Sequence, residues 1–377
     1  MQVALGLARR GLGNTHPNPA VGCVLVRPDM NNRVVGRGWT QSGGRPHAET
    51  VALQQAGDLA DDATAYVTLE PCCHHGKTTP CSDALISAGV KRVVIALEDP
   101  DPRVSGQGAK ALEDAGLHVT TDVCTLAAAK LNSGFMTRTL RGRPVFTLKI
   151  ASTVDGKTAS ATGDSQWITG PDARMSGHAQ RAAHDAILTG IGTVLSDDPM
   201  LTCRLPGCDD HSPVRVILDT KLSITPEHSM IRSASIDKPV WLFVSEEDAP
   251  PEKLSEIDHR DGVRVFTSPK QACGRLNVRE VSRQLADAGI NSVLIESGGE
   301  VAASFVGADL VDKIVWYRAP SLMGGEGKSA ISALEVTTID TAPRYECISA
   351  RQVGEDMMET YVTTRDPWVR DRDTESK

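Results

Sequence analysis

Short runs rich in β-branched residues alternate with helical stretches along almost the whole 377-residue chain. In the first half we expect strands at 20–26, 33–39 and 63–70, and a helix that begins at His47 and ends at Gly57. This alternation is typical of an α/β layer fold with one sheet. The same rhythm restarts beyond residue 144, and the pattern therefore predicts two α/β units.

A helix expected over 125–144 runs into a basic turn before Pro144, and we place the domain boundary there. The predicted domains are 1–143 and 144–365, followed by a polar tail at 366–377 that we expect to be frayed. The strands expected in the second domain are 145–153, 186–195, 214–220, 240–245, 263–267, 292–299 and 313–320.

Composition excludes several classes of partner. The net charge of −8 and an aromatic content of 4% argue against binding to nucleic acid. No apolar run reaches the ~18 residues that a membrane span needs. Nine cysteines, with three of them close together, suggest a reducing compartment and a metal site instead of a disulfide framework. We therefore expect a cytoplasmic protein.

Two stretches, "RPHAETVAL" from Arg45 and "LEPCCHHGKTTPC" from Leu69, carry residues that bind zinc. His47, Cys72 and Cys81 would supply three ligands, and water would occupy the fourth tetrahedral position of a catalytic site. Glu49 follows His47 by two residues, close to the metal without being a ligand. Zinc-dependent base deaminases use such a glutamate as their general acid and base. The spacing thus predicts a hydrolytic deaminase centre.

Alternatives to this ligand set remain open at this point. Cys73, His74 or His75 could complete a closed, four-ligand structural zinc site, and Cys23 on a strand also competes for the metal. The cluster could also hold no metal, and Glu49 could be an ordinary solvated carboxylate. The separation of eight residues between Cys72 and Cys81 is longer than in the common deaminase signature.

The second half lacks the dinucleotide fingerprint with three glycines. The stretch "LMGGEGKSA" looks like a phosphate loop, but Leu322 stands where its first glycine is needed, so we reject an ATP site. In "IESGGEVAASF", a strand is followed by Gly298 and Gly299 and then by a helix. This arrangement suits a pyrophosphate, because glycines allow close approach and the helix N-terminus offers N–H donors.

Many motifs together resemble one family, the bifunctional proteins of riboflavin biosynthesis. The first half carries "THPNPAVGCVLV", "PHAE", "AYVTLEPCCHHGKTTPC", "VVIALEDPDPRVSGQG" and "LNSGFMTR", and the second half carries "LKIASTVDGKTA", "GDSQWITG", "AILTGIGTVLSDDPMLTCR" and "IESGGEVAASF". The resemblance covers nearly the whole chain in the expected order. One departure is Cys73, where the family usually carries serine.

The resemblance implies a cytidine-deaminase-like α/β/α domain followed by a dihydrofolate-reductase-like α/β domain. A phosphoribosylamino diaminopyrimidinone would be deaminated hydrolytically, and its ribosyl chain would then be reduced to ribityl with NADPH. By similarity, His47, Cys72 and Cys81 bind zinc and Glu49 is catalytic. The expected cofactor contacts are Ala151, Trp167, Thr193, Asp197, Thr220, Gly298, Gly299, Glu300, Val301, Ala302, Ala303 and Ser304. The expected substrate contacts are Asn18, Ser165, Arg181, Leu201, Arg204 and Glu296.

Two other functions compete with this interpretation. One is a nucleic-acid base deaminase with an accessory domain, which the acidic charge disfavours, and the other is a zinc-stabilised nucleotide-binding module. The expected partners are small-molecule phosphoribosylaminopyrimidines, with neither nucleic acid nor membrane. The resemblance also implies a homo-oligomer.

Overall fold

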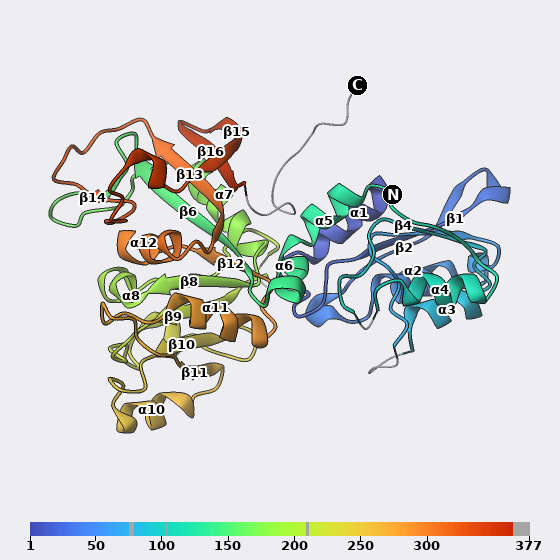
Figure 1. Cartoon of the computed structure of the whole chain (residues 1–377), viewed down its shortest axis with the longest axis horizontal. Helices are drawn as coiled ribbons and strands as arrows, with labels where there is room; N and C mark the ends of the chain where they lie inside the picture. Colours follow the sequence, from blue (N-terminus) through green and yellow to red (C-terminus); the bar gives the residue numbers. More distant parts are fainter. Residues whose placement is uncertain (75–78, 103, 209–210, 365–377) are drawn as a thin grey trace. The chain divides into compact units, whose positions relative to one another are not determined.

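The computed structural model describes residues 1–74, 79–102, 104–208 and 211–364 (Figure 1). It divides into two compact units, Met1–Gly142 and Arg143–Lys377. The tail expected at 366–377 lies outside the described residues. Within the described residues, no helix is both long enough and apolar enough to cross a bilayer.

The first unit is built on a mixed five-stranded sheet in the order β2-β1-β3-β4-β5. β1 pairs antiparallel with both β2 and β3, whereas β4 pairs parallel with β3 and β5. This unit is the single-sheet layer that the sequence predicts, although the strand expected over 63–70 ends at Val67. The strands are β1 (Gly22–Arg27), β2 (Arg33–Trp39), β3 (Thr64–Val67), β4 (Arg92–Ile95) and β5 (His118–Thr120).

Helices cover both faces of this sheet, with α1 and α5 on one side and α2, α3 and α4 on the other (Figure 1). Glycines let two helices lie directly on the strands. A Cβ at Gly22 would lie 2.0 Å from the carbonyl oxygen of Ala4, and one at Gly38 would lie 2.0 Å from that of Ala48. The helices are α1 (Gln2–Ala8), α2 (Ala48–Ala56), α3 (Cys81–Ser87), α4 (Gln107–Asp114), α5 (Thr125–Leu131) and α6 (Ser133–Arg141).

The single helix predicted over 125–144 is wrong, because the chain forms two helices that meet at Asn132. The backbone of Asn132 departs from helical geometry, with φ −101° and ψ 22°. Its buried side chain exchanges two hydrogen bonds with the backbone of Ala20. A contact between residues so far apart in the chain leaves no trace in local periodicity.

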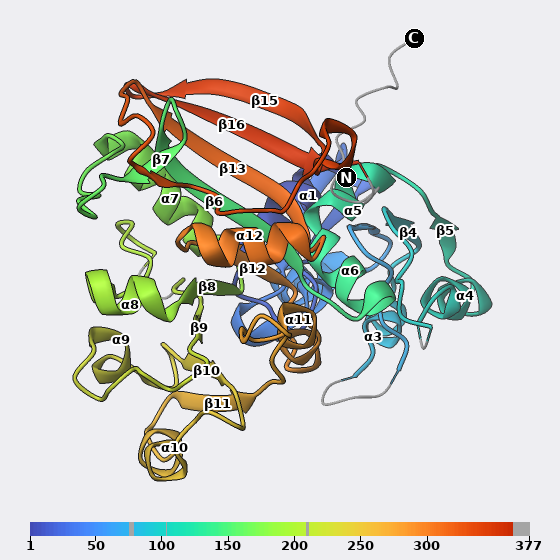
Figure 2. The same cartoon turned by 60° about the vertical axis from the view of Figure 1, so that its left-hand side comes forward.

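The second unit is built on a nine-stranded sheet in the order β11-β10-β9-β8-β12-β6-β13-β16-β15 (Figures 1 and 2). The pairs from β11 to β13 are parallel, and β16 and β15 add an antiparallel hairpin at one edge. The strands are β6 (Val145–Thr153), β8 (Ala186–Gly190), β9 (Val214–Leu218), β10 (Val240–Val244), β11 (Val263–Thr267), β12 (Ser292–Ile295), β13 (Val311–Ala319), β15 (Tyr345–Val353) and β16 (Asp356–Thr363), and a separate pair joins β7 (Lys157–Ala159) to β14 (Lys328–Ser329).

Successive residues of the parallel strands enter cores on opposite faces of this sheet. On β12, Val293 and Ile295 belong to the cluster that contains α11 and α12, whereas Leu294 belongs to the one that contains α8, α9 and α10. Burial on both faces explains why these strands are continuous apolar runs. The helices are α7 (Pro171–Ala182), α8 (Ile191–Asp197), α9 (Ser229–Arg232), α10 (Pro251–Asp258), α11 (Val278–Asp287) and α12 (Gly299–Gly307).

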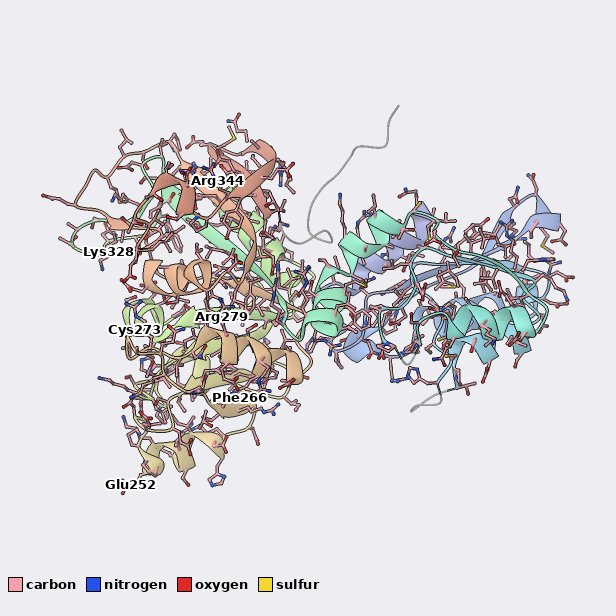
Figure 3. All side chains as sticks on the ribbon, viewed as in Figure 1. Glu252, Phe266, Cys273, Arg279, Lys328 and Arg344 are labelled. Carbon is pink, nitrogen blue, oxygen red and sulfur yellow. The ribbon has the colours of Figure 1, made fainter. Side chains whose placement is uncertain are left out.

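Three expectations for the second unit need correction. The strand predicted over 292–299 ends at Ile295, and Gly299 already begins helix α12. The run 186–195, predicted as one strand, is β8 as far as Gly190 and helix α8 beyond it, because a short apolar run fits a buried strand and a buried helix equally well. The β15–β16 hairpin was not predicted, because many side chains of β15 are exposed and lack an apolar pattern. Cys273, between β11 and α11, is also exposed (Figure 3).

A buried histidine gives the second unit a pH-dependent stability. His184 Nδ1 lies 2.7 Å from the carbonyl oxygen of Gln180, and Nε2 lies 3.0 Å from Thr147 Oγ1. Burial lowers the pKa of His184 from 6.5 to about 4. Between these values the unfolded chain binds a proton that the folded chain does not, so stability falls as the pH falls. We expect a loss of about 3 kcal/mol across this window.

Urea unfolding between pH 7.5 and 4 measures this effect by comparing the wild type with His184→Gln. The variant should lack this part of the pH dependence. His118→Gln, at an exposed histidine, is the matched control and should retain it. Parallel pH profiles for the wild type and His184→Gln would contradict the prediction.

Candidate functional site

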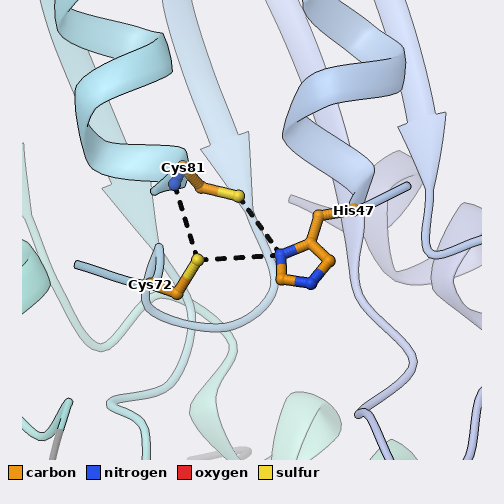
Figure 4. A group of neighbouring side chains, drawn as sticks. All are labelled: His47, Cys72 and Cys81. Carbon is orange, nitrogen blue, oxygen red and sulfur yellow. Dashed lines mark hydrogen bonds between the residues drawn. The ribbon is translucent and has the colours of Figure 1, made fainter. Parts of the chain in front are cut away.

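Three side chains from separate segments of the first unit converge on one point (Figure 4). His47 Nδ1 lies 3.7 Å from Cys72 Sγ and 3.3 Å from Cys81 Sγ. The three candidate ligand atoms all lie within 4.8 Å of one another. Zinc–sulfur and zinc–nitrogen bonds of about 2.3 and 2.05 Å at a tetrahedral angle imply a sulfur–nitrogen separation of about 3.5 Å. The observed distances fit such an ion.

The local fold brings these residues together at the starts of two helices. His47 is the N-cap of α2, and Cys81 is the first residue of α3. The start of α3 is held next to Cys72, because the backbone N–H of Ser82 donates to the carbonyl of Cys72 at 3.2 Å. The N–H of Cys81 also points at Cys72 Sγ, 3.4 Å away. The unusual spacing of the two cysteines therefore still permits one metal centre.

The cysteine thiols have shifted pKa values even before a metal is considered. Hydrogen bonds from Cys81 and His47 lower the pKa of the Cys72 thiol to about 4 despite its burial. The pKa of Cys81 is raised, first by its hydrogen bond to Cys72 and then by burial. A lowered pKa favours the thiolate form of Cys72, which is the form that binds metal ions.

Glu49 lies in the first turn of α2 and is only 3% exposed. Burial raises its pKa to about 7, and the nearby charge of Cys72 contributes. A carboxyl group with this pKa can both accept and release a proton near neutral pH. The structure therefore does not support the alternative that Glu49 is an ordinary solvated carboxylate.

The competing ligands do not join the group in the described part of the chain. Neither Cys73 nor His74 belongs to a cluster of potential ligands there, and His75 lies outside the described residues. Cys23 is fully buried on β1, where burial and the charge of Glu49 raise the pKa of its thiol. Within the described residues, the cluster of potential ligands thus consists of His47, Cys72 and Cys81.

A cavity of about 590 Å³ opens onto His47, Glu49 and Cys72. Asn18, the predicted substrate contact of this unit, also lines it. The Asn18 side chain donates to the carbonyl of Gly44 at 2.9 Å, and its Nδ2 lies 3.4 Å from His47 Nε2. The cavity can therefore hold a small molecule against the metal centre.

The cavity also contains residues to which the sequence analysis gave no role. Asp99 lines it, with a pKa that burial raises to about 6, and Phe135 and Arg138 line it from α6. Glu70 accepts hydrogen bonds from the N–H groups of Asp99, Gly106 and Ala109, which holds this wall in place. Asp99 follows β4 closely. Polar residues just after the carboxyl end of a strand often belong to binding sites in α/β folds, and this position could have identified Asp99 from the sequence. Phe135 and Arg138 lie in the motif "LNSGFMTR", which carries the family resemblance but assigned no role to either residue.

In the second unit, most residues expected to contact a cofactor lie near the carboxyl ends of neighbouring parallel strands. Ala151 lies on β6, Thr193 and Asp197 on α8 directly after β8, and Thr220 just after β9. Gly298 is the N-cap of α12, and residues 299–304 form its first turns. β8 and β12 are adjacent, and a Cβ at Gly190 would lie 2.8 Å from Val301. Two helix starts thus meet at one edge of the sheet.

Trp167 lies in the loop between β7 and α7. Trp167 is 68% exposed, and the Arg174 guanidinium lies 4.7 Å from the centroid of its ring. Ser165, a predicted substrate contact, lies in the same loop. This loop therefore places one expected cofactor contact and one expected substrate contact close together in the chain.

The other predicted substrate contacts of this unit form one connected group. Arg181 on α7 binds Glu296 through two nitrogens, at 2.8 and 3.0 Å, and donates to the carbonyl of Thr202 at 3.1 Å. Leu201 precedes Thr202 and is buried, whereas Arg204 is exposed and contacts His178. The guanidinium of Arg181, an expected substrate contact, is thus paired with a carboxylate.

Glu296 also lies 3.5 Å from Lys149 Nζ, and its side chain is 12% exposed. Burial alone would raise its pKa, but the charges of Lys149 and Arg181 outweigh burial and hold the pKa of Glu296 at about 2. Glu296→Gln would leave two cations without their carboxylate. We expect a loss of about 3 kcal/mol in the free energy of unfolding at pH 7, measured by urea unfolding.

The sign of the pH dependence gives a second check. Glu296 has a lowered pKa, so its contribution is present above pH 4.5 and is lost as the pH falls towards 2. The difference between wild type and Glu296→Gln should shrink over that window. The matched control is Asp287→Asn, which breaks a surface pair with Arg283 and should cost less than about 1 kcal/mol. Equal losses for both variants would refute the prediction.

Comparison with known proteins matches both units. Residues 1–97 match the cytidine and deoxycytidylate deaminase zinc-binding region, and residues 144–358 match the RibD C-terminal domain. The chain is 41% identical over 372 residues to the riboflavin biosynthesis protein RibD of Haemophilus influenzae, with 96% of each chain covered.

Two solved structures are similar over almost their full length. Acinetobacter baumannii RibD (form 2) has a TM-score of 0.85 and 36% identity, covering 97% of this chain and 98% of that one. A diaminohydroxyphosphoribosylaminopyrimidine deaminase/5-amino-6-(5-phosphoribosylamino)uracil reductase from Thermotoga maritima has a TM-score of 0.82 and 34% identity, covering 96% and 97%. These matches favour neither of the alternative functions. The chain therefore belongs to the RibD family of riboflavin biosynthesis proteins.

Proposed function

We propose that this chain catalyses two consecutive steps of riboflavin biosynthesis, with each step assigned to one unit. Residues 1–143 would deaminate 2,5-diamino-6-(5-phosphoribosylamino)pyrimidin-4-one, and residues 144–365 would reduce the ribosyl chain of the product to ribityl with NADPH. Membership of the RibD family makes the chain both a deaminase and a reductase. The convergence of His47, Cys72 and Cys81 beside buried Glu49 is the observation that carries the assignment of the first step.

His47, Cys72 and Cys81 would hold the zinc ion of the deaminase unit. A bound zinc lowers the pKa of a water molecule to about 7. Glu49 would be the acid–base group of the unit, accepting a proton from the attacking water and delivering a proton to the amino group that leaves as ammonia. Asn18 beside His47 supplies an amide that can bind the pyrimidine. His47, Glu49 and Asn18 all line the same cavity.

In the reductase unit, Gly298 and the first turn of α12 would hold the cofactor pyrophosphate. A Cβ at Gly299 would lie 2.6 Å from the carbonyl oxygen of Ser329, so glycine is needed for this close packing. NADPH supplies the hydride. Arg181, Glu296 and the segment 201–204 form one hydrogen-bonded group that would orient the ribosyl chain. Trp167, Ser165 and Thr220 would complete the contacts with cofactor and substrate.

Assays on the full chain can separate the two steps. We expect ammonia release from the diamino substrate without NADPH, and oxidation of NADPH only once the deaminated product is present. NADPH oxidation with the diamino substrate but without ammonia release would contradict the order of the steps. Gly298→Val is the sharper variant, because a Cβ at Gly298 would meet no protein atom within 4 Å. Loss of NADPH oxidation in this variant, with deamination retained, would support the assignment of α12.

The remaining proposals concern partners and location. We propose a cytoplasmic homo-oligomer that binds neither nucleic acid nor membranes. The net charge of −8 supports the lack of nucleic-acid binding. Sedimentation velocity tests the oligomer, and a single species at the mass of one chain would contradict it.

A further inference from the structure

The junction between α5 and α6 contacts the segment that carries Asn18. At this junction the backbone of Asn132 still makes helical hydrogen bonds, since its N–H donates to Ala128 at 3.1 Å and its carbonyl accepts from Met136 at 2.9 Å. Its side chain instead makes hydrogen bonds to the backbone of Ala20. Asn132 Oδ1 accepts from the Ala20 N–H at 2.9 Å, and Nδ2 donates to the Ala20 carbonyl at 3.0 Å. Both residues are only 4% exposed.

The backbone N–H and carbonyl of Ala20 need side-chain partners, because Ala20 lies just before the first residue of β1 that pairs with another strand. The pairing of β1 with β2 begins at Gly22, opposite Trp39. A buried backbone N–H and carbonyl without partners are costly. A side-chain amide offers one donor side and one acceptor side, as a peptide group on a neighbouring strand does. Asn132 thus takes the place of a strand partner for Ala20.

The position of Ala20 matters because Asn18 is only two residues away. Asn18 lines the cavity and lies 3.4 Å from His47 Nε2. The preceding Pro17 is also held from α6, because the Arg138 guanidinium donates to its carbonyl at 2.8 Å. The segment 17–20 is therefore fixed at both ends by residues of the α5–α6 region. That region lies outside residues 1–97, which match the zinc-binding deaminase model.

We propose that Asn132 is a positioning residue for the deaminase, which acts by holding Asn18 in the cavity. This inference rests on the proposed function of the first unit. Asn132 does not line the cavity, so its effect on the reaction passes through Ala20 and Asn18. Because it orients a binding group and not the proton shuttle, it should affect substrate binding more than turnover.

Steady-state ammonia release from the diamino substrate tests the proposal on the full chain. For Asn132→Ala we expect KM to rise about tenfold and kcat to stay within about twofold. Asn132→Asp keeps the size of the side chain but faces the Ala20 carbonyl with an oxygen, so it should raise KM similarly. Zinc content and NADPH-dependent reduction should be unchanged in both. Gln54→Ala, at an exposed amide on α2, is the matched control and should leave KM unchanged.

A double-mutant cycle with Asn18→Ala decides whether Asn132 acts through Asn18. In the Asn18→Ala background, Asn132→Ala should add less than about twofold to KM. If the two substitutions raised KM independently, so that their effects multiplied, the proposal would be overturned. Loss of zinc in both Asn132 variants would also overturn it, since Asn132 would then hold the fold or the metal. If the wild type itself released no ammonia from this substrate, the proposed function would fail first, and the role of Asn132 with it.

Discussion

Glu49→Gln is expected to lower kcat for ammonia release by about 10³-fold while zinc content stays at the wild-type level. The reason is geometric and chemical. Glu49 is 3% exposed beside Cys72 and Cys81, and burial brings its pKa to about 7, so it can carry the proton from water to the leaving amine. Glutamine has the same shape but cannot take up that proton. Ammonia release under saturating substrate measures the effect.

The reductase reaction of the same variant provides the control. Glu49→Gln should still oxidise NADPH when the deaminated product is supplied, because the residues expected to bind cofactor lie in the other unit. It should not oxidise NADPH when only the diamino substrate is supplied. Wild-type ammonia release by Glu49→Gln would remove Glu49 from the mechanism.

Cys81→Ser is expected to abolish both zinc binding and deamination. Cys81 is buried, and its sulfur lies 3.3 Å from His47 Nδ1, so its loss removes one of three ligands. A serine hydroxyl is a poor replacement, since zinc binding to cysteine requires the thiolate. We expect zinc content to fall from about one ion per chain to well below half an ion. Metal analysis after extensive dialysis, together with ammonia release, measures both losses.

Cys273→Ser is the matched control for this substitution. Cys273 is exposed in the second unit (Figure 3), far from the cluster in sequence, and its replacement should change neither zinc content nor either reaction. Cys73→Ser is a second comparison, because Cys73 is adjacent to Cys72 but belongs to no ligand cluster in the described part of the chain. Loss of zinc in Cys73→Ser would show a different ligand set.

Strands buried on both faces were predictable because their side chains are almost all apolar. β6 and β10 appear in the sequence as runs of apolar and β-branched residues, and their expected ranges agree with the structure to within a residue. The β8–α8 boundary at Gly190 was not predictable in this way, since the same apolar run continues into the helix. The exposed β15 strand carries too few apolar residues to be noticed.

The zinc cluster was predictable because its chemistry lies in the residue types themselves. Histidine and cysteine are recognisable as zinc ligands even when the spacing between them is unusual. Here hydrogen bonds from the N–H groups of Ser82 and Cys81 hold Cys72 next to Cys81. The place of Phe135 and Arg138 in the cavity wall was not predictable from the motif "LNSGFMTR" that contains them. Their helix begins just after Asn132, whose side chain hydrogen-bonds to Ala20, more than a hundred residues earlier.

Zinc-edge X-ray absorption of the purified full chain tests the central claim most directly. The account predicts two sulfur ligands at about 2.3 Å and two nitrogen or oxygen ligands at about 2.0–2.1 Å, one of them exchangeable water. This is the shell expected of His47, Cys72 and Cys81 with one open position. Three or more sulfur ligands, or a shell filled entirely by protein atoms, would contradict it, because no site would remain for the attacking water.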